Sequence, residues 1–240
     1  MKSSTRLLAR TDLPIPHSTS SPSVAEIDWY RRACHELQGV KRAVQTRQPW
    51  TLDELARIAS GVVASLGAND TLVQRVLQHD AGDYLVNNAV NVAIVSVKIA
   101  EGLRYESAKL EQVALAGLLH DLGMFVLPDS LRIQDRGVDG RRTPVRKGAS
   151  TAGARLFNNV GEAYPCVGRV ILQEHERRDG SGYPNRLTGD QIDEMALVIG
   201  LADGFDALMS PRPYRRGVSP HRGDLRAARK TARRSFRIIF

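Results

Sequence analysis

The chain has 240 residues, of which 42% are hydrophobic and 25% are charged, and its formal net charge is +8. These proportions are ordinary for a globular protein, and no apolar run approaches the roughly 20 residues of a membrane span. Two cysteines are too few for a disulfide framework, so free thiols in a reducing compartment are expected. The composition predicts a cytoplasmic protein without a transmembrane segment, with one sizeable domain.

The positive charge is concentrated near the C-terminal end. Residues 221–240 contain seven basic residues and one acidic residue, which account for +6 of the net +8. Such a segment could touch nucleic acid or an anionic membrane, but a solvated basic face explains it equally well. We therefore interpret residues 217–240 as a basic tail, the altered or shortened end of a domain, and the charge does not favour a nucleic-acid partner.

The N-terminal third is predicted to be helical after a disordered leader. Residues 1–22 are rich in Ser, Thr and Pro and have little to bury. A charged helix is expected over residues 25–45. Thr51 and Glu54 then have the spacing of a capping box that opens a second helix. A shorter helix follows, and residues 24–80 are predicted to form a small helical extension.

The rest of the chain is also predicted to be helical, because no alternating strand pattern appears. Apolar residues on most faces of the segment 83–102 predict a helix at the centre of the fold. A long loop is expected at 128–148, where Pro, Gly and Arg are frequent. Further helices are expected over residues 150–158, 163–176 and 191–208. The fold class is therefore all-α, with residues 81–216 as the main domain.

An adjacent His120 and Asp121 close an apolar helical segment that includes Leu110, Val113 and Leu118. An imidazole and a carboxylate at the end of a buried helix can be aimed at one point, and this ligand mixture suits a divalent metal. The alternative is a buried His–Asp pair that only caps the helix. The dipeptide alone does not decide between them.

Motifs further along the chain favour the metal-ligand interpretation of this pair. Glu174-His175-Glu176 precedes Asp179-Gly180-Ser181-Gly182-Tyr183-Pro184, and Ala202-Asp203-Gly204-Phe205-Asp206 and Arg212-Pro213-Tyr214-Arg215 follow. Over roughly residues 80–216 this series resembles the HD-GYP family, bacterial members of the HD superfamily of metal-dependent phosphohydrolases. Several motifs in the right order are a specific signal, whereas one alone would be weak. The resemblance implies a helical bundle that hydrolyses cyclic di-GMP with bound iron or manganese.

The resemblance also implies roles for individual residues. The metal ligands would be His120, Asp121, Glu174, His175 and Asp203, with a weak contribution from the amide oxygen of Asn88. Asp121 would also be catalytic, because it would bridge two ions. The substrate would be held by Arg212 and Arg215, whose guanidinium groups suit phosphate oxygens, and by Gly182 and Tyr183.

The chain departs from the family pattern at several ligand positions. Asn88 and Ala149 stand where members of the family carry ligand histidines, and Glu174 replaces the first His of a His-His-Glu motif. Tyr84 replaces a carboxylate that some members have, and Met124 replaces a lysine. These substitutions predict one or two metal ions rather than three, and reduced activity.

Two functions follow from this comparison. The first is an attenuated metal-dependent phosphodiesterase that acts on cyclic di-GMP or a related phosphoester. The second is a catalytically inactive signalling module that keeps the fold and binds a nucleotide or a signalling protein. His120, Asp121, His175 and Asp203 favour the first, whereas Asn88 and the other substitutions favour the second.

Overall fold

A computed structural model of the chain describes residues 24–78, 82–127 and 144–209. This described part is built of helices, and its extended pairing is limited to an isolated bridge between Asp179 and Thr188. The predicted all-α class is confirmed. None of the helices within the described ranges is long and apolar enough to cross a membrane.

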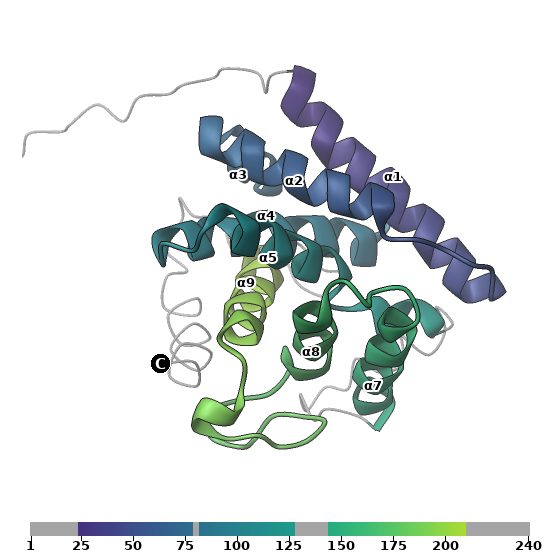
Figure 1. The fold of residues 1–240 in the computed structure, drawn as a ribbon. Coiled ribbons are helices and arrows are strands. Elements are labelled where there is room, and N and C mark those ends of the chain that lie inside the picture. The colour runs from purple at the N-terminus through teal and green to yellow at the C-terminus, as the bar shows by residue number, and fades with distance from the viewer. Residues whose placement is uncertain (1–23, 79–81, 128–143, 210–240) are drawn as a thin grey trace, which may run out of the picture.

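The N-terminal helices lie across one face of the bundle (Figure 1). They are α1 (Val24–Thr46), α2 (Asp53–Ala68) and α3 (Thr71–Val76). The predicted capping box at Thr51 and Glu54 is wrong, because α2 begins after Leu52 without a side-chain cap. The Glu54 carboxylate instead pairs with Arg32 of α1 and Arg57 of α2, each at 2.7 Å.

Helix α4 (Tyr84–Gly102) is the central element, as its apolar faces predict. It packs against both α5 (Ser107–Leu119) and α9 (Glu194–Met209), and α1, α2 and α3 also contact it. The Asp83 side chain begins α4 by accepting a hydrogen bond from the backbone N–H of Leu85 at 3.0 Å. Helix α5, which leads to His120, and helix α9, which carries Asp203, therefore meet along the central helix that carries Asn88.

The remaining helices lie below this layer in the view of Figure 1. They are η1 (Leu122–Val126), α7 (Pro144–Asn158), α8 (Pro165–Gln173) and η2 (Gly189–Gln191). The long loop expected at 128–148 ends earlier than predicted, because α7 already begins at Pro144. Proline suits the first turn of a helix, where its missing N–H has no partner to lose. Residues 128–143 lie outside the described part.

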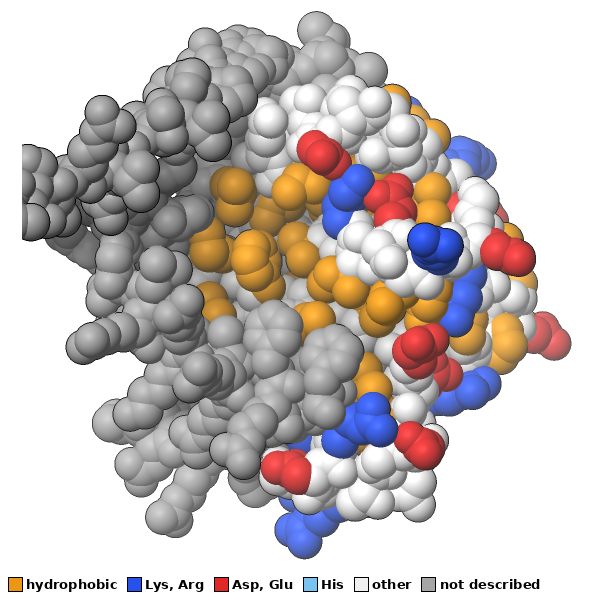
Figure 2. Space-filling model, turned by 90° about the vertical axis from the view of Figure 1, so that its left-hand side faces the viewer, with side chains coloured by type: hydrophobic (Ala, Val, Ile, Leu, Met, Phe, Trp, Pro, Cys, Tyr) orange, Lys and Arg blue, Asp and Glu red, His pale blue; other side chains and the backbone are white. Residues whose placement is uncertain are grey.

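One hydrophobic cluster runs through the described helices, from Leu37 and Leu55 to Ile94, Leu118 and Ile199. The large hydrophobic side chains that remain exposed there are Leu77, Leu103, Val126 and Phe205. Figure 2 shows hydrophobic side chains gathered on one face, beside the residues that are not described. Helices α1 and α2 thus share a single core with the helices that carry the predicted site motifs.

Candidate functional site

The His120-Asp121 pair lies at the corner between α5 and η1, as the sequence predicts. Helix α5 ends at Leu119, His120 is its C-cap, and Asp121 precedes η1. The His120 Nδ1 atom lies 2.8 Å from the backbone oxygen of Gly117. A carbonyl can only accept, so this nitrogen carries a proton, and in the neutral imidazole Nε2 presents the lone pair. Metal-ligating histidines are held in this way.

The Nε2 atom of His120 is buried and has no hydrogen-bond partner among the described residues. It lies 3.7 Å from Oδ2 of Asp121, which is beyond hydrogen-bond distance. A buried polar atom without a partner costs free energy that a bound cation could recover. The two side chains are therefore not joined by a hydrogen bond, and the free Nε2 is compatible with the predicted ligand role.

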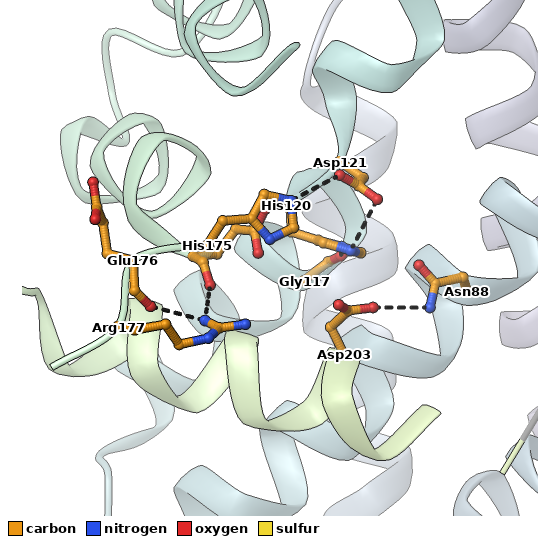
Figure 3. A network of polar contacts seen from close by, with 9 residues as sticks. Asn88, Gly117, His120, Asp121, His175, Glu176, Arg177 and Asp203 are labelled. Atoms are coloured by element: carbon orange, nitrogen blue, oxygen red, sulfur yellow. Dashed lines mark hydrogen bonds and ion pairs between the residues drawn. The ribbon is translucent and has the colours of Figure 1, made fainter. Parts of the chain in front are cut away.

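Glu174 and His175 approach the same point from the end of α8. His175 Nε2 lies 2.7 Å from Oε1 of Glu174 and 3.7 Å from Oδ1 of Asp121. Neither oxygen of the buried Glu174 carboxylate has a well-directed hydrogen bond within the described part of the chain. One ligand atom from each of Asp121, Glu174 and His175 can be chosen so that all three lie within 4.8 Å of one another. Figure 3 shows both imidazoles turned toward Asp121.

The electrostatics of this cluster follow from burial and charge together. Burial raises the pKa of Glu174, because the carboxylate loses its hydration. Burial opposes a charge on His175, but the neighbouring Glu174 and Asp121 carboxylates outweigh it and raise the pKa of His175 to about 9. The pKa of His120 is also raised, because the charges of Asp121, Asp203 and Glu174 outweigh its desolvation. Such a concentration of carboxylates favours a cation between them.

Asp203 reaches this region from α9, but its carboxylate has a partner on α4. Asn88 Nδ2 lies 3.3 Å from Oδ1 of Asp203 and 2.7 Å from Oδ2 of Asp206. Because both contacts are to carboxylate oxygens, the amide nitrogen must face them and the amide oxygen faces elsewhere (Figure 3). The expected weak ligand, the Asn88 oxygen, is therefore not directed at Asp203.

The segment 176–187 forms a tight wall beside His175. The rings of Tyr183 and His175 lie with their centroids 4.6 Å apart, and Tyr183 is buried. A Cβ atom on Gly182 would lie 2.3 Å from the Arg177 nitrogen and 2.4 Å from the Glu176 Cα. Only glycine therefore allows the two stretches of backbone to approach this closely. Gly182 and Tyr183 shape this wall, which is compatible with their predicted place in a substrate pocket.

A buried carboxylate holds this wall in place. Glu176 is 1% exposed and accepts hydrogen bonds from the backbone N–H groups of Asn185, at 2.6 Å, and Leu187, at 3.1 Å. Arg177 donates to the backbone oxygens of Glu174 and Glu176 at 3.1 and 2.8 Å. These bonds fix the backbone on both sides of His175.

Replacing Glu176 with Gln is expected to destabilise the protein. The amide nitrogen would face a backbone N–H and leave a buried donor unpaired, which costs about 1–3 kcal/mol. That corresponds to a fall in Tm of roughly 2–12 °C for a chain of this size. Thermal unfolding followed by circular dichroism measures it. The exposed Glu162→Gln change is the matched control and should leave Tm unaltered; equal Tm values for both variants would contradict this role.

The remaining positions are the predicted substrate-binding arginines and the substituted positions at which the chain departs from the family pattern. Arg212 and Arg215 lie outside the described residues. Ala149 and Met124 are buried, and the Ala149 backbone meets η1 at Gly123, two residues after Asp121. Tyr84 is the first residue of α4 and is half-buried.

Sequence reasoning missed a second group of polar residues behind Asp203. Asn91, one turn after Asn88 on α4, donates to Asp206 at 2.8 Å and accepts from the hydroxyl of Tyr30 at 2.9 Å. The signal was present, because two asparagines at this spacing are unusual in a helix that is otherwise apolar and buried. Their partners on α1 and α9 are 61 and 115 residues away in sequence, so the contact itself could not be foreseen.

Comparison with known proteins agrees with this geometry. Residues 73–233 match a family model described as an HD domain. The chain is 30% identical over 164 residues to the cyclic di-GMP phosphodiesterase response regulator RpfG of Xanthomonas campestris, covering 68% of this chain and 39% of the relative. It is 32% identical over 197 residues to the 3'3'-cGAMP-specific phosphodiesterase 1 of Vibrio cholerae, covering 81% of this chain and 43% of the relative. The chain thus spans less than half the length of these relatives.

A solved structure supports the same assignment at the level of fold. An HDGYP protein from Bdellovibrio bacteriovorus superposes with a TM-score of 0.62 and 19% sequence identity, over 82% of this chain and 64% of that chain. HD-domain phosphohydrolases are metal-dependent, and the described residues include a triad that could hold an ion. The chain belongs to the HD domain family, as its His120-Asp121 pair and the motifs after it predict.

Proposed function

We propose that this chain is a metal-dependent phosphodiesterase that hydrolyses cyclic di-GMP or a related cyclic dinucleotide. The observation that carries the proposal is the convergence of Asp121, Glu174 and His175 on one point beside the unpartnered Nε2 of His120. Relatives named as cyclic di-GMP and 3'3'-cGAMP phosphodiesterases support the substrate class. Two imidazoles with carboxylates suit iron or manganese.

Some of these residues would bind the metal, and others would orient the side chains that bind it. His120 would present its Nε2 lone pair, because the Gly117 carbonyl keeps the proton on Nδ1. Asp121 and Glu174 would supply negative oxygens, and Tyr183 would fix the plane of the His175 ring. A divalent metal held by these groups would activate water and offset charge on the phosphoryl oxygens. Arg212 and Arg215 are proposed to bind the phosphates.

A second function, a nucleotide-binding module without catalysis, is favoured by one observation. Asn88 turns its NH2 group, a hydrogen-bond donor, toward Asp203. A cation bound between these two residues would instead need a lone pair from the Asn88 side chain. A protein partner for such a module is also part of this alternative.

One experiment separates the two functions. The metal-free protein is titrated with Mn²⁺, and anaerobically with Fe²⁺, by calorimetry, and each form is then incubated with cyclic di-GMP while the products are separated by chromatography. Metal binding with formation of a linear dinucleotide is expected. Binding of cyclic di-GMP without any product would favour the module, and failure to bind either metal would overturn the enzyme proposal.

Restoring the missing ligands should strengthen the site. The triple change Asn88→His, Ala149→His and Met124→Lys replaces an amide and two apolar side chains with the groups that the family resemblance implies. Residues that only hydrogen-bond to metal ligands alter the metal affinity of a protein by about 10–100-fold. Additional side chains that bind the metal directly should therefore raise Mn²⁺ affinity at least about 10-fold and increase turnover. Calorimetry and the hydrolysis assay measure both. No gain in either would show that other elements of the site are missing.

A further inference from the structure

A chain of buried polar groups runs from helix α1 to Asp203. The Tyr30 hydroxyl lies 2.9 Å from Oδ1 of Asn91, Asn91 Nδ2 lies 2.8 Å from Oδ1 of Asp206, and Asn88 Nδ2 lies 2.7 Å from Oδ2 of Asp206. The same Asn88 nitrogen lies 3.3 Å from Oδ1 of Asp203. Three helices, α1, α4 and α9, therefore contribute to one connected network.

The direction of each hydrogen bond in this network is fixed. Both oxygens of Asp206 accept, so both asparagines must turn their nitrogens toward α9. The Asn91 oxygen is then left to accept from Tyr30. Burial raises the pKa of Tyr30, because the phenolate would lose its hydration, and the hydroxyl thus remains a donor.

Tyr30 is itself held firmly in place. Its side chain is 4% exposed, and the Arg75 guanidinium lies 4.9 Å from the centre of its ring. Tyr30 also lies well before residue 73, where the match to the family model begins. Helix α1 therefore reaches the back of the site from a part of the chain that the family model does not cover.

We infer that Tyr30, Asn91 and Asp206 are positioning residues that act through Asn88 to orient the Asp203 carboxylate toward a bound cation. The inference rests on the proposed function and extends it, because it adds Asp203, which the family resemblance implies as a metal ligand, to the groups that would hold the ion. Networks behind metal ligands fix the ligand's orientation, and losing a member typically costs about 10–100-fold in metal affinity. Helix α1 then contributes to the metal centre in addition to packing against the bundle.

Tyr30→Phe tests this inference, because it removes one hydroxyl and keeps the ring. Mn²⁺ affinity, measured by calorimetry on the metal-free protein, should fall by about 10-fold, the lower end of the range for such networks. The electron paramagnetic resonance spectrum of bound Mn²⁺ should also change, because the ligand geometry changes. Tyr105→Phe is the matched control: its hydroxyl lies 2.5 Å from the Glu194 carboxylate at the other end of α9, on an exposed surface. It should leave both readouts unaltered.

A double mutant separates positioning from general loosening of the fold. If Tyr30 acts through Asp203, then Tyr30→Phe should have no further effect on Mn²⁺ affinity in an Asp203→Asn background, whereas a purely structural effect would add to that of Asp203→Asn. Additive losses, or a Tyr30→Phe affinity equal to wild type, would overturn the inference and leave the proposed function intact. A wild-type protein that binds no Mn²⁺ or Fe²⁺ would overturn both.

Discussion

The Asp121→Asn variant is expected to lose the proposed metal binding and cyclic di-GMP hydrolysis while keeping its fold. The Asp121 carboxylate lies 3.7 Å from the Nε2 atoms of both His120 and His175, so it stands between the two imidazoles. An amide of the same size removes the negative charge, and it replaces one carboxylate oxygen with an NH2 group that has no lone pair to offer a cation. Mn²⁺ affinity should fall by more than the roughly 100-fold upper limit for outer-shell changes.

The matched control for the Asp121→Asn variant is Asp190→Asn. Asp190 is fully exposed and pairs with Arg178 at 3.1 Å on the surface, and exposed pairs of this kind contribute about 0–1 kcal/mol. Calorimetry with Mn²⁺ and the hydrolysis assay should therefore give wild-type values for this control. Wild-type affinity in Asp121→Asn as well would show that this carboxylate is not a ligand.

The largest loss of stability is expected from Gly123→Ala. A Cβ atom at this position would lie 1.8 Å from the backbone oxygen of Ala149 and 2.5 Å from its carbonyl carbon. Because the obstacle is backbone, either η1 or α7 must move. Overpacking a tight contact costs about 1–3 kcal/mol or more, and at 3 kcal/mol Tm would fall by roughly 6–12 °C. The displacement of η1 would also disturb Asp121, two residues earlier.

Gly148→Ala is the matched control for this change. Gly148 lies on α7 next to Ala149, is exposed, and would place its Cβ with no atom within 4 Å. Alanine at a free helical position stabilises a protein by about 0.4–1 kcal/mol. Thermal unfolding should thus shift in opposite directions for the two variants. A Tm for Gly123→Ala at or above that of wild type would contradict the close contact between η1 and α7.

Much of the helical framework could be predicted because its patterns are local. The apolar stripe before His120 and the apolar faces of 83–102 both became buried helices. Helix ends were harder, since they depend on partners elsewhere. Glu54 has the spacing of a capping residue but pairs with Arg32, 22 residues away. At the start of α7, the local signal of Pro144 was present and outweighed by the surrounding Gly and Arg residues.

The candidate site could be predicted only as far as its motifs extend. Asp121, Glu174 and His175 lie together because two short motifs end helices that point at one place. Asn88 was predicted as a weak ligand, but its orientation is set by Asp206, a residue 118 positions later in the chain. No pattern along the sequence specifies which atom of an amide faces a carboxylate. The roles of these residues as ligands remain predictions.

The single hydrophobic cluster bears on how this protein should be produced and dissected. A shortened version cut at residue 73, where the family match begins, would remove buried side chains such as Leu37, Leu55 and Ile58. Each contributes about 1.5–3 kcal/mol by its burial, and their departure would uncover the apolar surfaces of α4 and α5. Expression boundaries are therefore better placed ahead of residue 24, with the first helix kept together with the rest of the bundle.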